Sequence, residues 1–308
     1  MRFKIKLSLF VSLILIASSL SASTIDGELV DRTLVSLDKN TIDEIKKIEP
    51  QIESIITKVD TFQITYRSDG LKIKGYVAIP KKDGTYPCVI FNRDGEMENG
   101  VLNDAGAVFH MATVASRGYV VIASQYRGNA GGEGIEEFGG SDLNDVLNLI
   151  PTLDNFSKAD NSRLGMYGIG RGGMMTYLAL KNTDKISAAV VVGGVSDLFS
   201  TLVEQPESDG LFRDIIPNYD TEKEEQLSRR SAIKWVDQLD RGAQILILHG
   251  ADDNQVSANQ ALRMSSVLFK NNYSSMFVLF RNGNHWLSGH YAEKMKLIRE
   301  WFDSFLLN

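Results

Sequence analysis

The sequence predicts an α/β fold built around a mostly parallel sheet, and three observations support this prediction. After residue 86, short runs rich in Val, Ile and Leu alternate with helical segments. These runs are apolar along their whole length, as expected for strands that helices cover on both faces. A strongly alternating hairpin pattern precedes them. The sequence therefore predicts one large domain with eight strands and helices on both faces of the sheet.

The individual elements follow from the same patterns. Residues 61–80 read as two alternating strands around the turn Ser68-Asp69-Gly70, which is a hairpin signal. Six further strands are expected in the segments CVIFN, YVVIASQ, LGMYG, AAVVVGG, ILILHG and MFVLF. Helices are expected near 103–117, 140–155, 171–182, 256–271 and 290–306.

Residues 1–22 have the order of a secretory signal. A basic start is followed by the apolar run 7–17 and then by small residues that suit cleavage near Ala22. The run is short for a membrane span, although an uncleaved anchor is the alternative. We therefore expect a secreted or periplasmic protein. Cleavage would change the net charge from −6 to −9, and this acidic balance gives no reason to expect nucleic acid or an anionic membrane as a partner.

Two further segments depart from the alternation of strands and helices. Residues 23–60 are polar and charged with a helical stretch that Pro50 interrupts, which predicts two short helices or a kink outside the main domain of residues 61–308. Residues 196–240 show no strand pattern and read as a helical insertion, either a lid beside the ligand crevice or a decorative addition. The single cysteine, Cys88, lies in an apolar strand and is expected to be a buried thiol.

The stretch GMYGIGRGGMM, residues 165–175, fits two different motifs. It matches the dinucleotide fingerprint G-x-G-x-x-G. It also matches the nucleophile elbow G-x-S-x-G of serine hydrolases, except that Gly170 stands at the serine position. The fingerprint requires an acidic residue at the end of the next strand and normally opens its sheet. Here the next strand ends in glycines and several strands come first, so the sequence favours the elbow.

The elbow interpretation predicts an acid and then a histidine further along the chain, each just after a strand. After ILIL comes HGADDNQV, which contains Asp252 and Asp253, and after MFVLF comes RNGNHW, which contains His285. The order is that of an α/β hydrolase. From about residue 61 to the end, the chain resembles the prolyl oligopeptidase-like branch of these enzymes, a family of serine peptidases and esterases. The segments ASRGYVVIASQYRG, RGGMMTYLAL and HGADDNQV carry the resemblance.

The resemblance implies the α/β-hydrolase fold, hydrolysis of peptide-like or ester substrates, and no cofactor. It places the nucleophile at Gly170, the acid at Asp253 with Asp252 as the alternative, and the histidine at His285. The oxyanion hole would use the backbone N–H of Arg171 and a donor from Arg93 or its neighbourhood. The adjacent Asp94 places a negative charge beside a site that must stabilise the negative charge developing on the substrate oxygen. No metal-binding spacing of His and Cys is present.

Glycine preserves the strained backbone of an elbow while it removes the nucleophile. The sequence therefore predicts a catalytically impaired or inactive member of this branch. Two alternatives stay open at this stage. Another nucleophile such as Ser196, which follows the next strand, could act, or His285 could activate a water molecule. A natural loss of the serine and an engineered one are likewise not distinguished.

Overall fold

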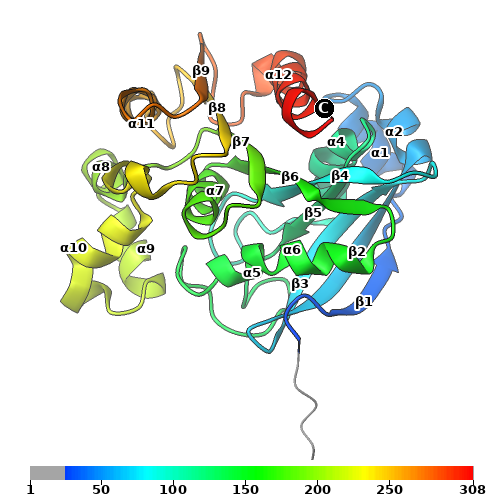
Figure 1. Cartoon of the computed structure of the whole chain (residues 1–308), viewed down its shortest axis with the longest axis horizontal. Coiled ribbons are helices and arrows are strands. Elements are labelled where there is room, and N and C mark those ends of the chain that lie inside the picture. The colour runs from blue at the N-terminus through cyan, green and yellow to red at the C-terminus, as the bar shows by residue number, and fades with distance from the viewer. Residues whose placement is uncertain (1–24, 308) are drawn as a thin grey trace, which may run out of the picture.

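A computed structural model describes residues 25–307 of the protein. Within these residues one sheet of nine strands, in the order β1-β2-β3-β5-β4-β6-β7-β8-β9, runs through the middle of the molecule (Figure 1). Every neighbouring pair from β5 to β9 is parallel, while β1, β2 and β3 pair antiparallel. The α/β class predicted from the sequence is confirmed.

The antiparallel part of the sheet is the predicted hairpin extended by one strand. β2 (Val59–Ser68) and β3 (Leu71–Pro80) pair over ten residues, and Asp69 and Gly70 both have positive φ, as a two-residue hairpin turn requires. The ninth strand, β1 (Leu29–Leu34), pairs with β2 at the edge of the sheet. The sequence did not predict β1, because this edge strand is largely solvent-exposed and carries no buried apolar pattern.

The parallel strands coincide with the predicted apolar runs. They are β4 (Tyr86–Asn92), β5 (Val120–Ser124), β6 (Ala159–Ile169), β7 (Ile186–Val192), β8 (Gln244–Gly250) and β9 (Ser275–Phe280). The interiors of β4, β5, β7 and β8 and the second half of β6 are buried because helices cover both faces of the sheet, which is why these strands lack the alternation of the hairpin. The edge strand β9 is only partly buried. Cys88 lies buried in β4, as expected, and burial raises the pKa of its thiol to about 12.

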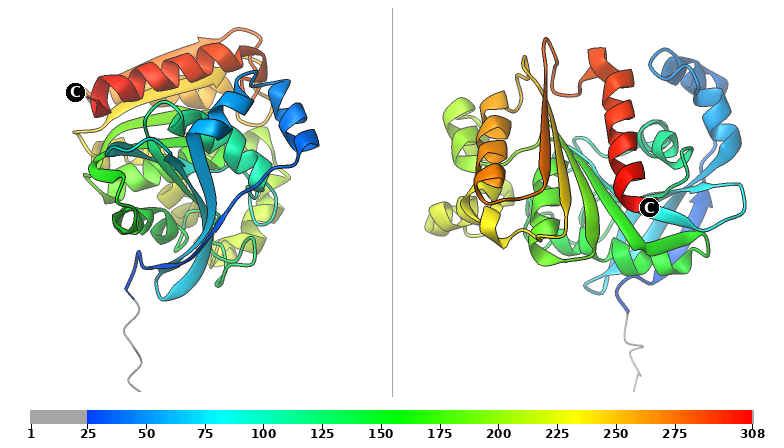
Figure 2. Two further views of the ribbon diagram at one scale, coloured as in Figure 1. Left: turned by 90° about the vertical axis from the view of Figure 1, so that its right-hand side faces the viewer. Right: turned by 45° about the horizontal axis from the view of Figure 1, so that its top comes forward.

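Helices cover both faces of the sheet, as the rotated views show (Figure 2), and two clusters of buried apolar side chains pack between the sheet and these helices. One of these layers of helices contains α5 (Leu143–Leu147), α6 (Leu149–Thr152), α7 (Arg171–Asn182) and α11 (Ala258–Lys270). The other contains α1 (Lys39–Lys46), α2 (Ile52–Lys58), α3 (Asp104–Ala107), the π-helical turn Val108–Ala112, α4 (Thr113–Ala115) and α12 (Tyr291–Leu306). The two short helices α1 and α2 flank Pro50, in agreement with the predicted interruption.

The segment 196–240 is helical within the described part of the chain, as predicted, and follows β7. It contains α8 (Leu198–Glu204), α9 (Ser208–Ile215), α10 (Tyr219–Arg230) and two short 3₁₀ turns. Residues 1–24, which include the predicted signal sequence, lie outside the described residues. Between residues 25 and 307, no helix combines the length and the apolar character that crossing a membrane demands.

Candidate active site

The turn from β6 to α7 has the geometry that the elbow interpretation predicts. Gly170 caps the N-terminus of α7 with φ of 54° and ψ of −120°, a conformation that residues with a side chain rarely adopt. The helix also approaches β4 closely, since a Cβ atom on Gly172 would lie 2.0 Å from the carbonyl oxygen of Asn92. Gly170 therefore allows the unusual backbone conformation of the turn, and Gly172 allows close packing of α7 on β4. These two roles account for both glycines without a bound dinucleotide.

Asp253 and His285 meet beside this turn, at the carboxyl ends of β8 and β9. Nδ1–H of His285 donates to Oδ2 of Asp253 across 2.8 Å. The second carboxylate oxygen, Oδ1, accepts from the backbone N–H groups of Gln255 and Val256, both at 2.9 Å. These bonds fix the carboxylate and orient the imidazole, as the acid and histidine of a hydrolase triad require.

A second histidine supports the same carboxylate. Nε2 of His249, at the end of β8, lies 3.1 Å from Oδ2 of Asp253 and 2.8 Å from the carbonyl oxygen of Val256. The ring is completely buried, so it fixes the loop from inside. Asp252 is exposed, whereas the side chain of Asp253 is buried against His285. Of the two acids considered from the sequence, it is Asp253 that contacts the histidine.

A second carboxylate, that of Asp94, lies where a serine side chain would project from Gly170. Its Oδ1 accepts from the backbone N–H of Arg171 across 2.8 Å. Its Oδ2 lies 3.1 Å from Nε2 of His285. Asp94 thus contacts both groups that a serine hydrolase needs at this point, the first oxyanion donor and the proton-accepting nitrogen.

Asp94 and a side chain at position 170 exclude each other. A Cβ atom built on Gly170 would lie 2.0 Å from Oδ1 and 2.6 Å from Oδ2 of Asp94. Real Cβ contacts are never this short, and Asp94 is held on both oxygens, so its carboxylate would have to leave. The glycine at position 170 therefore does more than relieve backbone strain, because it also makes room for the carboxylate.

The loop that carries Asp94 is fastened by Arg93, whose side chain is buried. Its guanidinium donates to the carbonyl oxygens of Gln125, Asp94, Asn99 and Met97 at 2.9 to 3.3 Å. These bonds hold the loop 93–99 against Gln125, the residue directly after β5. The donors of Arg93 are therefore used to shape the loop, and the structure does not bring them to the oxyanion position considered from the sequence.

The side chain of Arg171 stabilises the elbow from the other side. Its guanidinium lies between the rings of Tyr126 and Phe138, 4.6 and 4.7 Å from their centroids, and forms ion pairs with Glu136 and, at 2.5 Å, with Asp142. Burial lowers the pKa of Arg171, but Asp142 and Glu136 outweigh burial and raise this pKa above its ordinary value. The guanidinium therefore stays charged. Arg171 is thus anchored so that its N–H points at Asp94.

The two carboxylates change the acid–base properties of His285. Burial lowers the pKa of His285, but the hydrogen bonds to Asp253 and Asp94 outweigh burial and raise it to about 9. In return, the pKa of Asp94 is lowered despite burial, chiefly by His285 and by the N–H groups of Arg171 and Gly95. At neutral pH the site therefore holds an imidazolium between two carboxylates. An imidazolium has no free lone pair with which to accept a proton.

Substitution of Gly170 by alanine is expected to destabilise the protein by about 2–4 kcal/mol, because the added Cβ meets the Asp94 carboxylate in addition to the cost of positive φ. Urea unfolding measures the change. The matched control is Gly131→Ala. Gly131 has φ of 76° but nothing within 4 Å of the added Cβ, so only the conformational cost of about 1 kcal/mol is expected.

The double variant Gly170→Ala/Asp94→Ala isolates the steric part of this effect. The added Asp94→Ala is expected to restore most of the free energy of unfolding that Gly170→Ala loses beyond the loss of Gly131→Ala. Equal losses for Gly170→Ala and Gly131→Ala would show that Asp94 does not occupy the space above Gly170.

The structure brings together Gly170, the N–H of Arg171, Asp253 and His285, as the sequence indicated. It adds Asp94 as a direct partner of His285, whereas the sequence suggested only an unfavourable neighbouring charge. It also adds His249 behind Asp253. Ser196 is buried, and its hydroxyl donates to the carbonyl oxygen of Gln260 at 3.3 Å.

Comparison with known proteins places this site in a family. The family model of the prolyl oligopeptidase family matches residues 107–308, about two thirds of the chain. The chain belongs to the prolyl oligopeptidase family. The match includes the elbow, Asp253 and His285. The matched residues begin after the loop that carries Asp94, so Asp94 itself lies outside the match.

Curated relatives from bacteria are similar over most of the chain. An uncharacterized peptidase of Bacillus subtilis strain 168, YtmA, is 30% identical over 211 residues, which are 68% of this chain and 80% of the relative. Dipeptidyl-peptidase 5 of Porphyromonas gingivalis is 24% identical over 238 residues, 71% of this chain but 34% of its own length. The chain thus spans most of one relative and about a third of the other.

Solved structures show the same fold at lower identity. The acylaminoacyl peptidase of Pyrococcus horikoshii superposes with a TM-score of 0.68 at 23% identity, over 84% of this chain and 44% of that protein. A puromycin hydrolase superposes with a TM-score of 0.66 at 20% identity, over 78% and 38% of the two chains. These likenesses confirm the α/β-hydrolase fold of the prolyl oligopeptidase family.

Proposed function

We propose that this protein is a catalytically inactive, exported member of the prolyl oligopeptidase family that binds a peptide-like or ester ligand without hydrolysing it. The observation that carries the proposal is the Asp94 carboxylate, which contacts the N–H of Arg171 and Nε2 of His285 above Gly170. Of the components of serine chemistry that survive in the chain, this carboxylate contacts the oxyanion donor and the histidine, while Asp253 keeps its contact with His285.

Loss of the serine removes the covalent route, and Asp94 opposes the remaining routes. A substrate carbonyl that approached the oxyanion position would have to displace a carboxylate from the Arg171 N–H. The developing negative charge would then lie beside the negative charge of Asp94, which destabilises the transition state. The protonated His285 cannot act as a general base at neutral pH.

Export is the second part of the proposal. It rests on the basic, apolar and small-residue order of residues 1–22, which suits a cleaved signal and a secreted or periplasmic protein. N-terminal sequencing of the protein recovered from its native host tests it. A mature chain that starts shortly after Ala22 is expected, whereas recovery of a chain that starts at Met1 in the cytoplasmic fraction would contradict export.

A second candidate function is slow hydrolysis of activated esters by a water molecule that His285 deprotonates. The intact contact between Asp253 and His285 favours it, since this pair orients the imidazole as in an active hydrolase. The raised pKa of His285 restricts this route to alkaline solution. Neutral imidazole becomes the main form only above about pH 9.

The proposal predicts no measurable turnover of p-nitrophenyl acetate near pH 7 and no adduct with a fluorophosphonate probe. Any activity that depends on His285 is expected to increase about tenfold for each pH unit up to pH 9 and then level off, because the fraction of neutral imidazole does so. Rates are compared with those of His285→Ala, which reports the hydroxide background. Stoichiometric labelling at pH 7, or turnover at pH 7 that His285→Ala abolishes, would contradict an inactive site.

A further inference from the structure

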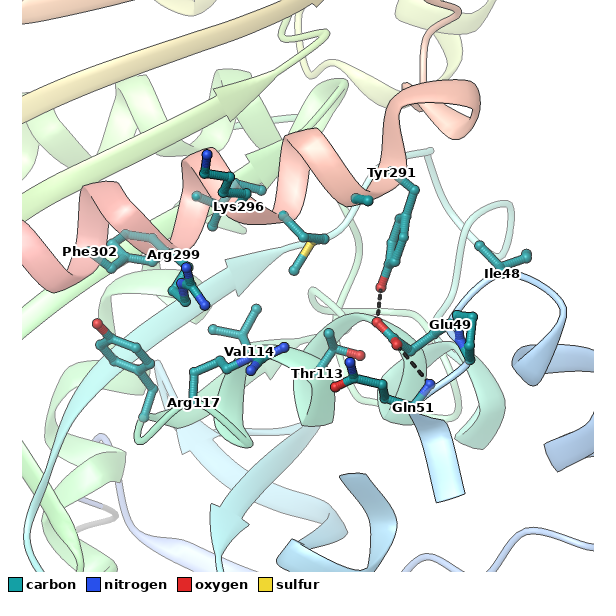
Figure 3. A pocket seen from close by; sticks show the side chains of 15 residues that line it. Ile48, Glu49, Gln51, Thr113, Val114, Arg117, Tyr291, Lys296, Arg299 and Phe302 are labelled. Carbon is teal, nitrogen blue, oxygen red and sulfur yellow. Dashed lines mark hydrogen bonds between the residues drawn. The ribbon is translucent and has the colours of Figure 1, made fainter. Parts of the chain in front are cut away.

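A cavity separate from the candidate active site lies between the N-terminal segment and the last helix. Its volume is about 340 Å³, within the range of small-molecule sites. The turn between α1 and α2 forms one wall, α4 and the start of β5 form another, and α12 closes it (Figure 3). None of the residues that line it belongs to the elbow, to the loop 93–99 or to the Asp253–His285 pair.

The interior of the cavity is apolar. Ile298 and Phe302 of α12 are fully buried at its base, and Val114 of α4 packs opposite them. The other apolar groups that line it are those of Ile48, Pro50, Tyr119, Tyr291, Ala292 and Met295. Such a surface suits an aliphatic or flat apolar body, whose burial there is favourable.

The charged groups that line the cavity already have partners, with one exception. The carboxylate of Glu49 accepts from the N–H of Gln51 at 3.0 Å and lies 3.4 Å from the hydroxyl of Tyr291 (Figure 3). The guanidinium of Arg299 lies 3.9 Å from Asp303, and Lys296 lies 3.8 Å from Glu300. These two acids of α12 balance Lys296 and Arg299, the two cations of the helix that line the cavity.

Arg117 is the exception. No hydrogen bond or ion pair joins its side chain to any residue between 25 and 307. The residue follows α4 and lines the cavity, and in Figure 3 the side chains of Arg117 and Arg299 both reach into the space between α4 and α12. An unpaired guanidinium at the edge of an apolar cavity is suited to bind a carboxylate.

We propose that this cavity binds an amphipathic carboxylate with a medium-length alkyl chain, a fatty acid in chemical terms. The carboxylate contacts Arg117, with Arg299 beside it, and the alkyl chain lies on Val114, Met295 and Phe302. The positive charge of Arg117 favours an anionic head group, and the apolar lining of the cavity favours an alkyl chain. Both parts of the ligand therefore follow from the residues that line the cavity. This site is independent of the proposed loss of hydrolysis.

Isothermal titration calorimetry with decanoate tests the proposal. The wild-type protein is expected to bind one decanoate, and Arg117→Gln is expected to weaken binding by about tenfold or more. Met295→Trp fills the cavity and is expected to abolish binding. Lys270→Gln, on α11 across the sheet, is the matched charge control and is expected to bind as the wild type does. Circular dichroism of each variant verifies that it is folded.

Decanol separates the two parts of the site. It lacks the charge, so its affinity is expected to be the same for the wild type and for Arg117→Gln. Absence of decanoate binding to the folded wild type at about 1 mM would overturn the proposal. So would binding that neither Arg117→Gln nor Met295→Trp changes. The variant Gly170→Ser/Asp94→Ala is expected to bind decanoate normally, which keeps the result separate from hydrolysis.

Discussion

Gly170→Ser alone is expected to leave the protein without esterase activity, whereas Gly170→Ser together with Asp94→Ala is expected to hydrolyse p-nitrophenyl acetate. The expected gain of the double variant over the single one is at least about 100-fold, because the second change frees both an oxyanion donor and the histidine. Initial rates at pH 7.5 and labelling by a fluorophosphonate probe measure it.

The reason is the overlap at the elbow. A serine at position 170 places its Cβ 2.0 Å from Oδ1 of Asp94, so either the serine or the carboxylate must be displaced. While the carboxylate remains near, the N–H of Arg171 and Nε2 of His285 keep an anionic partner. Removal of Asp94 leaves the pair of Asp253 and His285 free to act on the new hydroxyl.

Asp94→Ala alone is the control, since it removes the carboxylate without supplying a nucleophile, and it is expected to stay inactive toward the probe. Equal activity of Gly170→Ser and of the double variant would show that Asp94 is no barrier. An inactive but folded double variant would show that the rest of the site has also lost competence, and the inactive state would then not be explained by these two positions.

Asp94→Asn is expected to lower the pKa of His285 from about 9 to below about 8. The amide has nearly the size of the carboxylate and keeps an oxygen for the N–H of Arg171, but it removes the negative charge beside Nε2. Titration of the imidazole protons by nuclear magnetic resonance measures the pKa. Asp252→Asn, which changes an exposed acid in the same loop as Asp253, is expected to leave it unchanged.

The contact between Asp94 and His285 also makes the stability of the protein depend on pH. The pKa of His285 in the folded protein lies above its ordinary value of 6.5, so its stabilising contribution is complete below pH 6.5 and is lost as the pH rises through about 9. The free energy of unfolding of the wild type is therefore expected to decrease between pH 7 and 9 by more than that of Asp94→Asn. Parallel curves for the two proteins would show that Asp94 does not stabilise the imidazolium.

Much of the fold could be predicted because each parallel strand contains an apolar run, which in β6 is only its second half, and because the functional residues follow these runs. The order of Gly170, Asp253 and His285 along the chain identified their shared location at the ends of β6, β8 and β9. The edge strand β1 was missed because backbone bonds to β2 mainly define it, and its largely exposed side chains leave no pattern in the sequence.

The role of Asp94 could not be read from the sequence, since it depends on direction and distance. The sequence shows an acid in the loop after β4, but only the folded backbone shows that its oxygens reach the N–H of Arg171 and Nε2 of His285. The support of Asp253 by His249 is likewise a matter of three-dimensional packing. The sequence offered two signals for this arrangement, the glycine at the serine position and the acid at position 94 beside the expected oxyanion site.

The overlap between position 170 and Asp94 also has a historical consequence. In a chain with a serine at the elbow, the carboxylate could not take its inward position, because the two side chains claim the same volume. An aspartate at position 94 would then have to turn elsewhere until the serine was lost. From the present pair, neither Gly170→Ser nor Asp94→Ala alone gives a complete serine site, because the first leaves the carboxylate crowding the serine and the second supplies no nucleophile.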